Sequence, residues 1–311
     1  GNICEKNCFY CGIRRGNSVV ERYTMGVEEI VESAVWAYRA AYGSLVLQSG
    51  ERTGAAFVSF VEDVLQEIGR RTGGELGITL SLGEQPESVY RRWFEAGAHR
   101  YLLRIETTRP ELYRQLHPAD HRFEERLDCL RRLRRTGYQV GTGVMIGLPG
   151  QAVTDLADDV LFFRERDIDM IGMGPYIPHA DTPLSGERER FRADRQFLLG
   201  LKMIAVTRLV LRDVNIAATT ALQALHPEGR EQGLLAGANI VMPNVTATKY
   251  RDGYRLYDDK PCLDENSSMC KACLRGRIEA IGERIGFGLR GDSPHFFRRQ
   301  ARRSSSRVRG R

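Results

Sequence analysis

Residues 4–12 read CEKNCFYCG, and this stretch places three cysteines, Cys4, Cys8 and Cys11, in a C-x3-C-x2-C pattern. Three thiolates on one tight loop suit three irons of a 4Fe–4S cube and leave the fourth iron open to an exogenous ligand. A structural zinc loop is the alternative, but it usually needs a fourth Cys or His nearby, and none occurs before His99. The pattern therefore predicts a 4Fe–4S cluster with one open coordination position.

A second group of thiols lies near the other end of the chain, where Cys262, Cys270 and Cys273 form a C-x7-C-x2-C pattern. This group could hold an accessory 2Fe–2S or 4Fe–4S cluster, a zinc ion or no metal at all, and the adjacent acids Asp264 and Glu265 offer oxygen ligands. The total of seven cysteines is odd and no secretory signal is visible, which argues against a disulfide framework. We expect a reducing, cytoplasmic compartment.

Composition narrows the class of protein. The 311 residues are 42% hydrophobic and 28% charged, so the chain can build a sizeable core and is not disordered as a whole. No apolar run approaches the ~18 residues that a membrane span needs. Because the sequence opens at Gly1 and not at a Met, we expect it to begin inside the natural chain.

The net charge of +6 is concentrated at one end, because seven arginines lie in residues 298–311 and the remaining chain is close to neutral. A basic nucleic-acid interface would spread its charge over a binding face, so nucleic acid is not an expected partner. We predict a single domain over residues 1–285 and a basic, disordered tail over residues 286–311.

Periodicity along the chain indicates strands that alternate with amphipathic helices. The expected strands cover residues 45–48, 77–82, 100–104, 139–146, 170–174, 215–218 and 239–242. The expected helices cover residues 27–42, 55–71, 86–96, 123–136, 153–166, 194–211 and 228–236. Cys129 falls on the apolar side of one of these helices, where it is expected to fill the core. With a truncated first strand leading into Ile3, the series predicts an α/β fold, an N-terminally truncated (β/α)8 TIM-type barrel.

Polar residues gather where these strands end, which is where barrel enzymes carry their chemistry. One strand ends in Gln48-Ser49-Gly50-Glu51, and another ends in Arg104-Ile105-Glu106. Arg104 and Glu106 are two residues apart, so they share one face of their strand and could equally form a structural ion pair.

Several motifs together resemble the HydE family of iron-only hydrogenase maturases, within the radical S-adenosylmethionine (SAM) superfamily. The resemblance spans about residues 2–275. Besides the cysteine loop, it rests on VLQSGE (46–51), ITLSLGE (78–84), MIGLPGQ (145–151), MIGMGPYIPHADTPL (170–184), ATTA (218–221) and GANIVMPN (237–244). Biotin synthase and methylornithine synthase share the cluster loop and the SGE turn, but they are less similar elsewhere.

This resemblance implies the cofactors and the residues that bind them. Cys4, Cys8 and Cys11 would hold the 4Fe–4S cluster, and SAM would bind its open iron. The residues that would line the SAM site are Tyr10, Gln48, Ser49, Gly50, Glu51, Glu106 and Arg126. The residues that would hold an anionic substrate inside the barrel are Thr79, Arg104 and Met242, with Arg104 and Glu106 nearest the chemistry. Tyr250 and Tyr254 would close the cavity, and the trailing cysteines match an optional second cluster.

The activity implied is reductive cleavage of SAM to a 5′-deoxyadenosyl radical during assembly of the hydrogenase cluster and its dithiomethylamine bridge. The substrate would be an iron-bound cysteine complex, the reductant a ferredoxin or flavodoxin, and the partners other maturases. Ile105 stands where the family often has His, and Arg52 where an acid is common, so another radical SAM mutase or sulfur-chemistry enzyme acting on an amino acid is the alternative. A non-catalytic metal- or RNA-binding protein is a third hypothesis.

Overall fold

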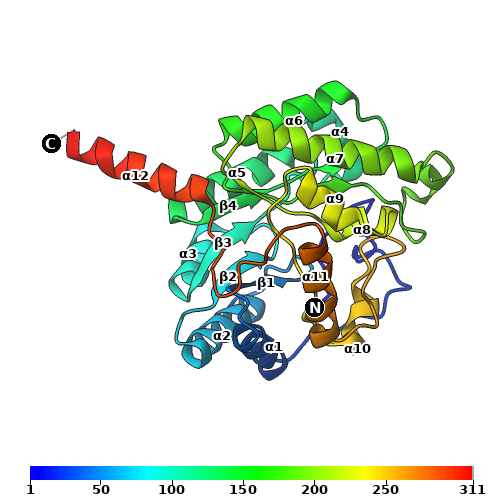
Figure 1. The fold of residues 1–311 in the computed structure, drawn as a ribbon. Helices are drawn as coiled ribbons and strands as arrows, with labels where there is room; N and C mark the ends of the chain where they lie inside the picture. The colour runs from blue at the N-terminus through cyan, green and yellow to red at the C-terminus, as the bar shows by residue number, and fades with distance from the viewer. Residues whose placement is uncertain (310–311) are drawn as a thin grey trace.

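The computed structural model describes residues 1–309, and Figure 1 shows helices wrapped around a curled parallel sheet. Six strands pair side by side in the order β1-β2-β3-β4-β6-β8, and every pairing is parallel. These strands are β1 (Ser44–Gln48), β2 (Gly77–Ser81), β3 (Ala98–Leu102), β4 (Gln139–Thr142), β6 (Met170–Ile171) and β8 (Asn215–Ile216). A bridge between Ala217 and Ile240 continues the ladder beyond β8.

Two of the expected strands are each divided into two pieces. A separate parallel pair, β5 (Met145–Ile146) and β7 (Gly174–Pro175), follows β4 and β6 along the chain. The division falls where the two backbones come too close for a side chain, because a Cβ on Gly143 would lie 2.0 Å from the carbonyl oxygen of Gly172. The periodicity of the sequence does not report such a contact, since both glycines belong to apolar runs.

Helices alternate with the strands, and most of them pack around the outside of the sheet (Figure 1). They are α1 (Val27–Arg39), α2 (Ala55–Thr72), α3 (Glu87–Glu95), α4 (Pro110–Leu116), α5 (Phe123–Thr136), α6 (Val153–Glu165), α7 (Ala193–Val210), α8 (Thr220–Leu225), α9 (Gly229–Leu235), α10 (Thr248–Arg251), α11 (Ser267–Ala280) and α12 (Pro294–Arg309). Helix α2 ends at Gly73, whose φ of 61° is the left-handed conformation that closes a helix without a Cβ penalty. Among residues 1–309, no helix is apolar and long enough to span a bilayer.

The core lies between this helical layer and the sheet. Large side chains from α3, β3 and the start of β4 interlock there, and Trp93, Tyr101 and Tyr138 are fully buried. The indole N–H of Trp93 donates to the carbonyl of Val58 at 3.1 Å, so the polar atom of the largest core side chain is satisfied. Cys129 is also fully buried in this cluster, which confirms its expected place in the core.

The alternation of strands and helices and the parallel order confirm the predicted TIM-type α/β architecture. Within the described residues the ladder is an open, curled sheet, because no strand there pairs with the outer edge of β1.

The expectation of a disordered tail from residue 286 is wrong for the part of it that the structure describes. Asp292 accepts hydrogen bonds from Arg100 at 3.1 Å, in the middle of β3, and from Gln139 at 2.7 Å, the first residue of β4. Asn215 donates to the carbonyl of Gly291 at 2.7 Å. The segment therefore covers the amino ends of the strands, since those ends present polar groups that need partners. Helix α12 follows and projects from the body, while Gly310 and Arg311 lie outside the described residues (Figure 1).

Candidate active site

The cysteine loop is held by the turn that follows β1. The backbone N–H of Glu51 donates to the Cys4 sulfur at 3.3 Å, and the carbonyl of Glu51 accepts from the N–H of Glu5 at 2.8 Å. Gly50 is required here by space, because a Cβ at this position would lie 2.3 Å from the carbonyl oxygen of Ile3. The SGE motif (49–51) therefore contacts the cysteine loop directly.

The three thiols of this loop are free, and three free thiols on one loop are ligands of the kind that the irons of a cluster need. Their sulfurs do not all lie within 4.8 Å of one another, so among the described residues they are not a group that converges on a single ion. Thiolates that each bind a different iron of a cube would not need to converge in that way. Burial raises the pKa of all three thiols, that of Cys11 to about 12, so they stay protonated at neutral pH until a metal displaces the protons.

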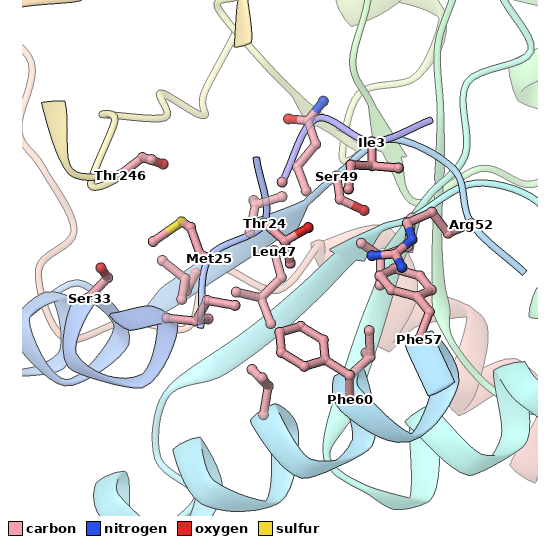
Figure 2. Close-up of a pocket in the computed structure, with 18 of the residues that line it drawn as sticks. Ile3, Thr24, Met25, Ser33, Leu47, Ser49, Arg52, Phe57, Phe60 and Thr246 are labelled. Carbon is pink, nitrogen blue, oxygen red and sulfur yellow. The ribbon is translucent and has the colours of Figure 1, made fainter. Parts of the chain in front are cut away.

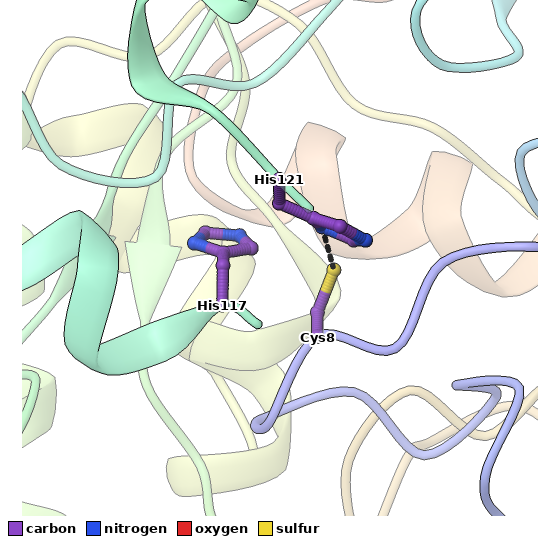
Figure 3. A group of neighbouring side chains, drawn as sticks. All are labelled: Cys8, His117 and His121. Carbon is purple, nitrogen blue, oxygen red and sulfur yellow. Dashed lines mark hydrogen bonds between the residues drawn. The ribbon is translucent and has the colours of Figure 1, made fainter. Parts of the chain in front are cut away.

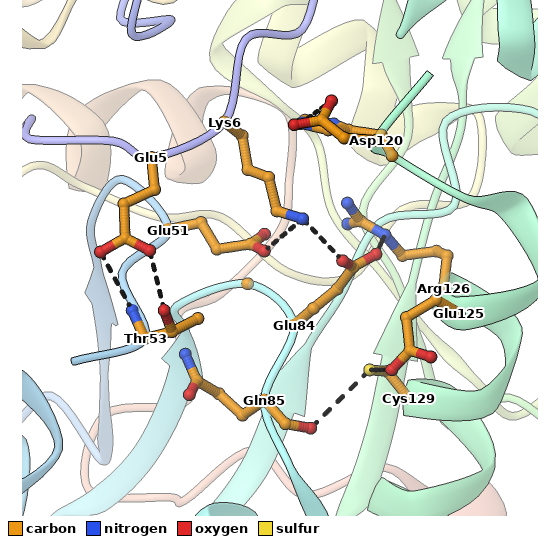
Figure 4. Close-up of polar contacts among 12 residues, drawn as sticks. Glu5, Lys6, Glu51, Thr53, Glu84, Gln85, Asp120, Glu125, Arg126 and Cys129 are labelled. Carbon is orange, nitrogen blue, oxygen red and sulfur yellow. Dashed lines mark hydrogen bonds and ion pairs between the residues drawn. The ribbon is translucent and has the colours of Figure 1, made fainter. Parts of the chain in front are cut away.

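A buried network of four charges lies beside the loop (Figure 4). The ammonium of Lys6 is 3.2 Å from a carboxylate oxygen of Glu51 and 3.0 Å from one of Glu84, and the Nε of Arg126 donates to the other Glu84 oxygen at 2.7 Å. Burial acts to lower the pKa of Lys6, but the two carboxylates outweigh it and raise that pKa. Gly83 makes the close approach possible, because a Cβ there would lie 2.2 Å from the Glu51 carboxylate.

Arg104 and Glu106 lie together after β3, as their spacing predicts. An amino group of Arg104 is 2.9 Å from a Glu106 carboxylate oxygen and also donates to the carbonyl of Val144 at 3.0 Å. Arg126 donates to the backbone carbonyl of Arg104 at 3.1 Å, so this pair is coupled to the buried network. Glu106 has a φ of 66°, a sparsely populated conformation for a residue other than glycine, and such strain is typical of functional sites.

Tyr10 is anchored by a histidine from the segment after α4. The Nδ1 of His117 contacts the carbonyl of Tyr113 at 2.8 Å, which places the proton on Nδ1 and leaves Nε2 to accept from the Tyr10 hydroxyl at 3.3 Å. Burial lowers the pKa of His117 to about 3, so the ring stays neutral. A second histidine, His121, lies beside Cys8 (Figure 3).

The remaining residues of the predicted cofactor and substrate sites are more scattered. Gln48 is exposed, and Ser49 bonds the carbonyl of its neighbour Gly50 at 2.7 Å. The hydroxyl of Thr79 accepts from Arg100 at 3.0 Å, toward the amino ends of the strands and away from the cysteine loop. Met242 is 39% exposed. These positions are not brought together with Arg104 by any described contact.

The two tyrosines expected to close the cavity lie in different surroundings. Tyr250 stacks on Tyr23, with ring centroids 4.7 Å apart, and its hydroxyl donates to the Glu29 carboxylate at 2.9 Å, which ties it to α1. Tyr254 lies near the cluster loop, where burial, with a further contribution from the Cys11 thiol, raises its pKa.

The trailing cysteines form a second, partial ligand group. The sulfurs of Cys262 and Cys270 and a carboxylate oxygen of Glu265 all lie within 4.8 Å of one another. The buried guanidinium of Arg251 holds this loop by donating to the carbonyls of Cys262, at 2.9 Å, and of Glu265. Cys273 is exposed and outside the group, so only two of the three predicted thiols converge here.

A largely apolar pocket lies beside the site rather than in it. It opens along β1 between α1 and α2, and side chains such as Leu47, Phe57 and Phe60 line it (Figure 2). Gln48 and Ser49 border it, but none of the three cysteines of the loop does. Most of its lining side chains are apolar, and Arg52, Thr24 and Ser33 add polar groups.

Sequence reasoning overlooked four residues of this site, Lys6, Glu84, His117 and His121. Lys6 lies in the cysteine motif (4–12) and Glu84 in the motif ITLSLGE (78–84). The opposite charges of these two side chains could have indicated that they pair. The two histidines lie in a stretch without any recognised motif, and only the fold brings them to the cysteine loop.

Comparison with known proteins gives consistent matches over most of the chain. The model of the Radical SAM superfamily matches residues 1–163. The [FeFe] hydrogenase maturase subunit HydE of Thermotoga maritima is 48% identical over 92% of this chain and 79% of its own length. The 3-methylornithine synthase of Methanosarcina barkeri is 29% identical over 90% of this chain and 76% of its own. A crystal structure of methylornithine synthase superposes with a TM-score of 0.77 at 28% identity, covering 92% of this chain and 80% of that one.

Proposed function

Since this chain belongs to the HydE family of the radical SAM superfamily, we propose that it cleaves SAM reductively in the maturation of [FeFe] hydrogenase. A 4Fe–4S cluster with SAM bound would supply the radical chemistry, in the form of a 5′-deoxyadenosyl radical. The observation that carries the proposal is the set of three free thiols on a loop held by Gly50 and Glu51. Cys4, Cys8 and Cys11 would hold the cluster, and Tyr10 would cover it.

The residues around the loop would bind and orient SAM. Gln48, Ser49 and Glu51 would line its methionine end, and Glu106 its amino acid or ribose. The role of Arg126 toward the SAM carboxylate is constrained by its contact with Glu84, which already occupies Nε at 2.7 Å. We therefore propose that Arg126 acts on SAM through a remaining amino group while Glu84 holds the guanidinium in place.

Arg104 would hold the substrate. Its Nε is buried without a hydrogen-bond partner, and a buried donor of this kind costs free energy unless a ligand satisfies it. An anionic ligand such as an iron–cysteine complex carrying CO and cyanide, or the carboxylate of an amino acid, would supply a charge-assisted bond there. Contacts of Thr79 and Met242 with the substrate stay predictions. The Thr79 hydroxyl already accepts a hydrogen bond from Arg100.

The partners of the reaction follow from the same proposal. A ferredoxin or flavodoxin would supply the electron, and other hydrogenase maturases would deliver the substrate or accept the product for the dithiomethylamine bridge. We expect the reaction to take place in the cytoplasm and under anaerobic conditions.

The group around Cys262 would hold an accessory centre. Two thiols and the Glu265 carboxylate within 4.8 Å of one another, on a loop fixed by Arg251, support a metal site there. We propose that Cys273 completes a small iron–sulfur cluster. Iron, zinc and sulfide analysis of the C270A/C273A double variant tests this, and metal content equal to that of the unaltered protein contradicts it.

The experiment that tests the main proposal uses the anaerobically reconstituted protein with dithionite and SAM. We expect 5′-deoxyadenosine and methionine without further substrate, and turnover coupled to a new product when the iron–cysteine complex is added. Activation of apo-hydrogenase in the presence of the other maturases is the second readout. Formation of 3-methylornithine from an added amino acid would favour the amino-acid mutase instead, and an absence of SAM cleavage would favour the non-catalytic alternative.

A further inference from the structure

His121 lies against one of the cluster cysteines (Figure 3). Its Nδ1 is 3.7 Å from the Cys8 sulfur, within hydrogen-bonding range for sulfur, and the side chain is only 1% exposed. Neither the radical SAM motif nor the proposed SAM and substrate sites account for this contact.

The ring is held in place from the segment between α4 and α5. The backbone N–H of His121 donates to the carbonyl of Pro118 at 3.0 Å, and its ring centroid is 5.6 Å from that of His117. His117 is itself fixed, because it stacks on Tyr113 at 4.0 Å and contacts the Tyr113 carbonyl. A side chain fixed in this way can present one ring nitrogen to the sulfur without a loss of rotamer freedom.

The direction of the hydrogen bond follows from what a metal-bound sulfur can do. A thiolate on iron has no proton and can only accept, so the contact is a hydrogen bond only when His121 carries its proton on Nδ1. The other nitrogen, Nε2, is 3.9 Å from the nearest carboxylate oxygen of Asp120, too far to compete for the proton.

We propose that His121 donates an N–H···S hydrogen bond to Cys8 and thereby raises the reduction potential of the 4Fe–4S cluster. The bond stabilises negative charge on the sulfur, and the reduced cluster carries one more negative charge than the oxidised cluster. His121 is therefore a positioning residue that makes the first electron transfer easier, and it is not an iron ligand. The inference rests on the proposed function in one respect, that Cys8 binds the cluster.

The test compares His121→Phe, which keeps a ring but removes the donor, with His121→Asn, whose amide N–H can replace Nδ1–H. His226→Phe is the matched control, because that ring stacks on Phe197 at 5.0 Å in another part of the molecule. Iron and sulfide content is measured first, and EPR-monitored redox titration follows. At the solution potential that half-reduces the unaltered protein, we expect H121F to show about threefold less reduced cluster, with H121N and H226F close to the unaltered value.

Several outcomes would overturn the inference. An unchanged titration of H121F with full cluster content would show that the bond has no effect on the potential. Loss of cluster iron in both H121F and H121N would make His121 a ligand. If H121F does not fold, pulsed EPR of the unaltered protein labelled with ¹⁵N-histidine tests the inference instead. A weak magnetic coupling between the cluster and a ¹⁵N nucleus supports the hydrogen bond, and the absence of any such coupling refutes it. A lack of cluster in the unaltered protein would instead count against the proposed function.

Discussion

At the scale of the single residue, the cysteine loop depends on charges that it shares with the barrel. Lys6 lies inside the loop and contacts two carboxylates, while Arg126 contacts one of them from α5. The two positive and two negative charges cancel, and the attraction between them compensates for the hydration that each charge loses on burial. Removing one partner of such a buried set leaves an uncompensated charge, which typically costs about 3–5 kcal/mol.

Glu84→Gln is therefore expected to lower the free energy of unfolding by about 2–4 kcal/mol and to reduce cluster iron, because Lys6 and Arg126 lose their common partner. Glu87→Gln is the matched control, since Glu87 pairs with Arg135 at 2.6 Å on the surface and should change stability by less than about 1 kcal/mol. Urea unfolding and iron analysis measure both effects. Equal stability of the two variants would contradict the importance of this network.

Cys8→Ser should abolish the brown iron–sulfur chromophore and SAM cleavage, because two thiolates cannot hold three irons. Cys129→Ala is the control, since that thiol is fully buried in the core and should affect stability alone. Absorbance and 5′-deoxyadenosine release report the two outcomes. SAM cleavage by Cys8→Ser at the unaltered rate would show the cluster assignment to be wrong.

The ion pair of Arg104 and Glu106 gives a third residue-level prediction. Glu106→Gln should weaken SAM binding and cleavage together, whereas Arg104→Met should keep cleavage but lose its coupling to product, because an anionic substrate lacks its counter-charge. SAM titration and product analysis separate the two. Since the side chains are 2.9 Å apart, a purely structural pair would instead give both variants one common defect with unchanged SAM affinity.

At the scale of the element, the turn after β1 (residues 49–51) positions the cluster loop by close backbone contact. Gly50→Ala would place a Cβ 2.3 Å from the Ile3 carbonyl, so the loop must shift, at a cost of about 1–3 kcal/mol. Gly54→Ala is the control, because nothing lies within 4 Å of its added Cβ. We expect lower cluster iron and a lower melting temperature for G50A alone. Matching behaviour of the two variants would refute the steric role of the turn.

At the scale of the whole molecule, residues 286–299 join the ends of several strands and helices. His295 links Asp167 at 2.7 Å to Asp213 at 3.2 Å, and these hydrogen bonds and charges raise its pKa above the ordinary 6.5. A raised pKa means that the folded state favours the protonated ring. The stabilisation is therefore complete below pH 6.5 and is lost as the pH rises through the folded-state value.

His295→Gln should consequently cost about 1 kcal/mol of stability at pH 6 and less at pH 9. Unfolding in urea at several pH values measures the difference between the variant and the unaltered protein. A difference that stays constant from pH 6 to pH 9 would show that the charge of His295 does not hold this segment.

The sequence by itself determined the local features of this protein. The spacing of apolar residues placed a helix at residues 123–136, where α5 lies, because an amphipathic period depends only on near neighbours. The cysteine spacing and the SGE motif indicated the superfamily, since cluster ligands on one loop are close in sequence.

Only the tertiary structure decided the rest. It split two of the expected strands where Gly143 meets Gly172, turned Thr79 toward Arg100, and placed residues 286–299 against the amino ends of the strands. It also brought Glu84, His117 and His121 to the cysteine loop. These contacts join residues far apart in the chain, and the free energy that selects them comes from burial and charge pairing in the folded state, which no local pattern records.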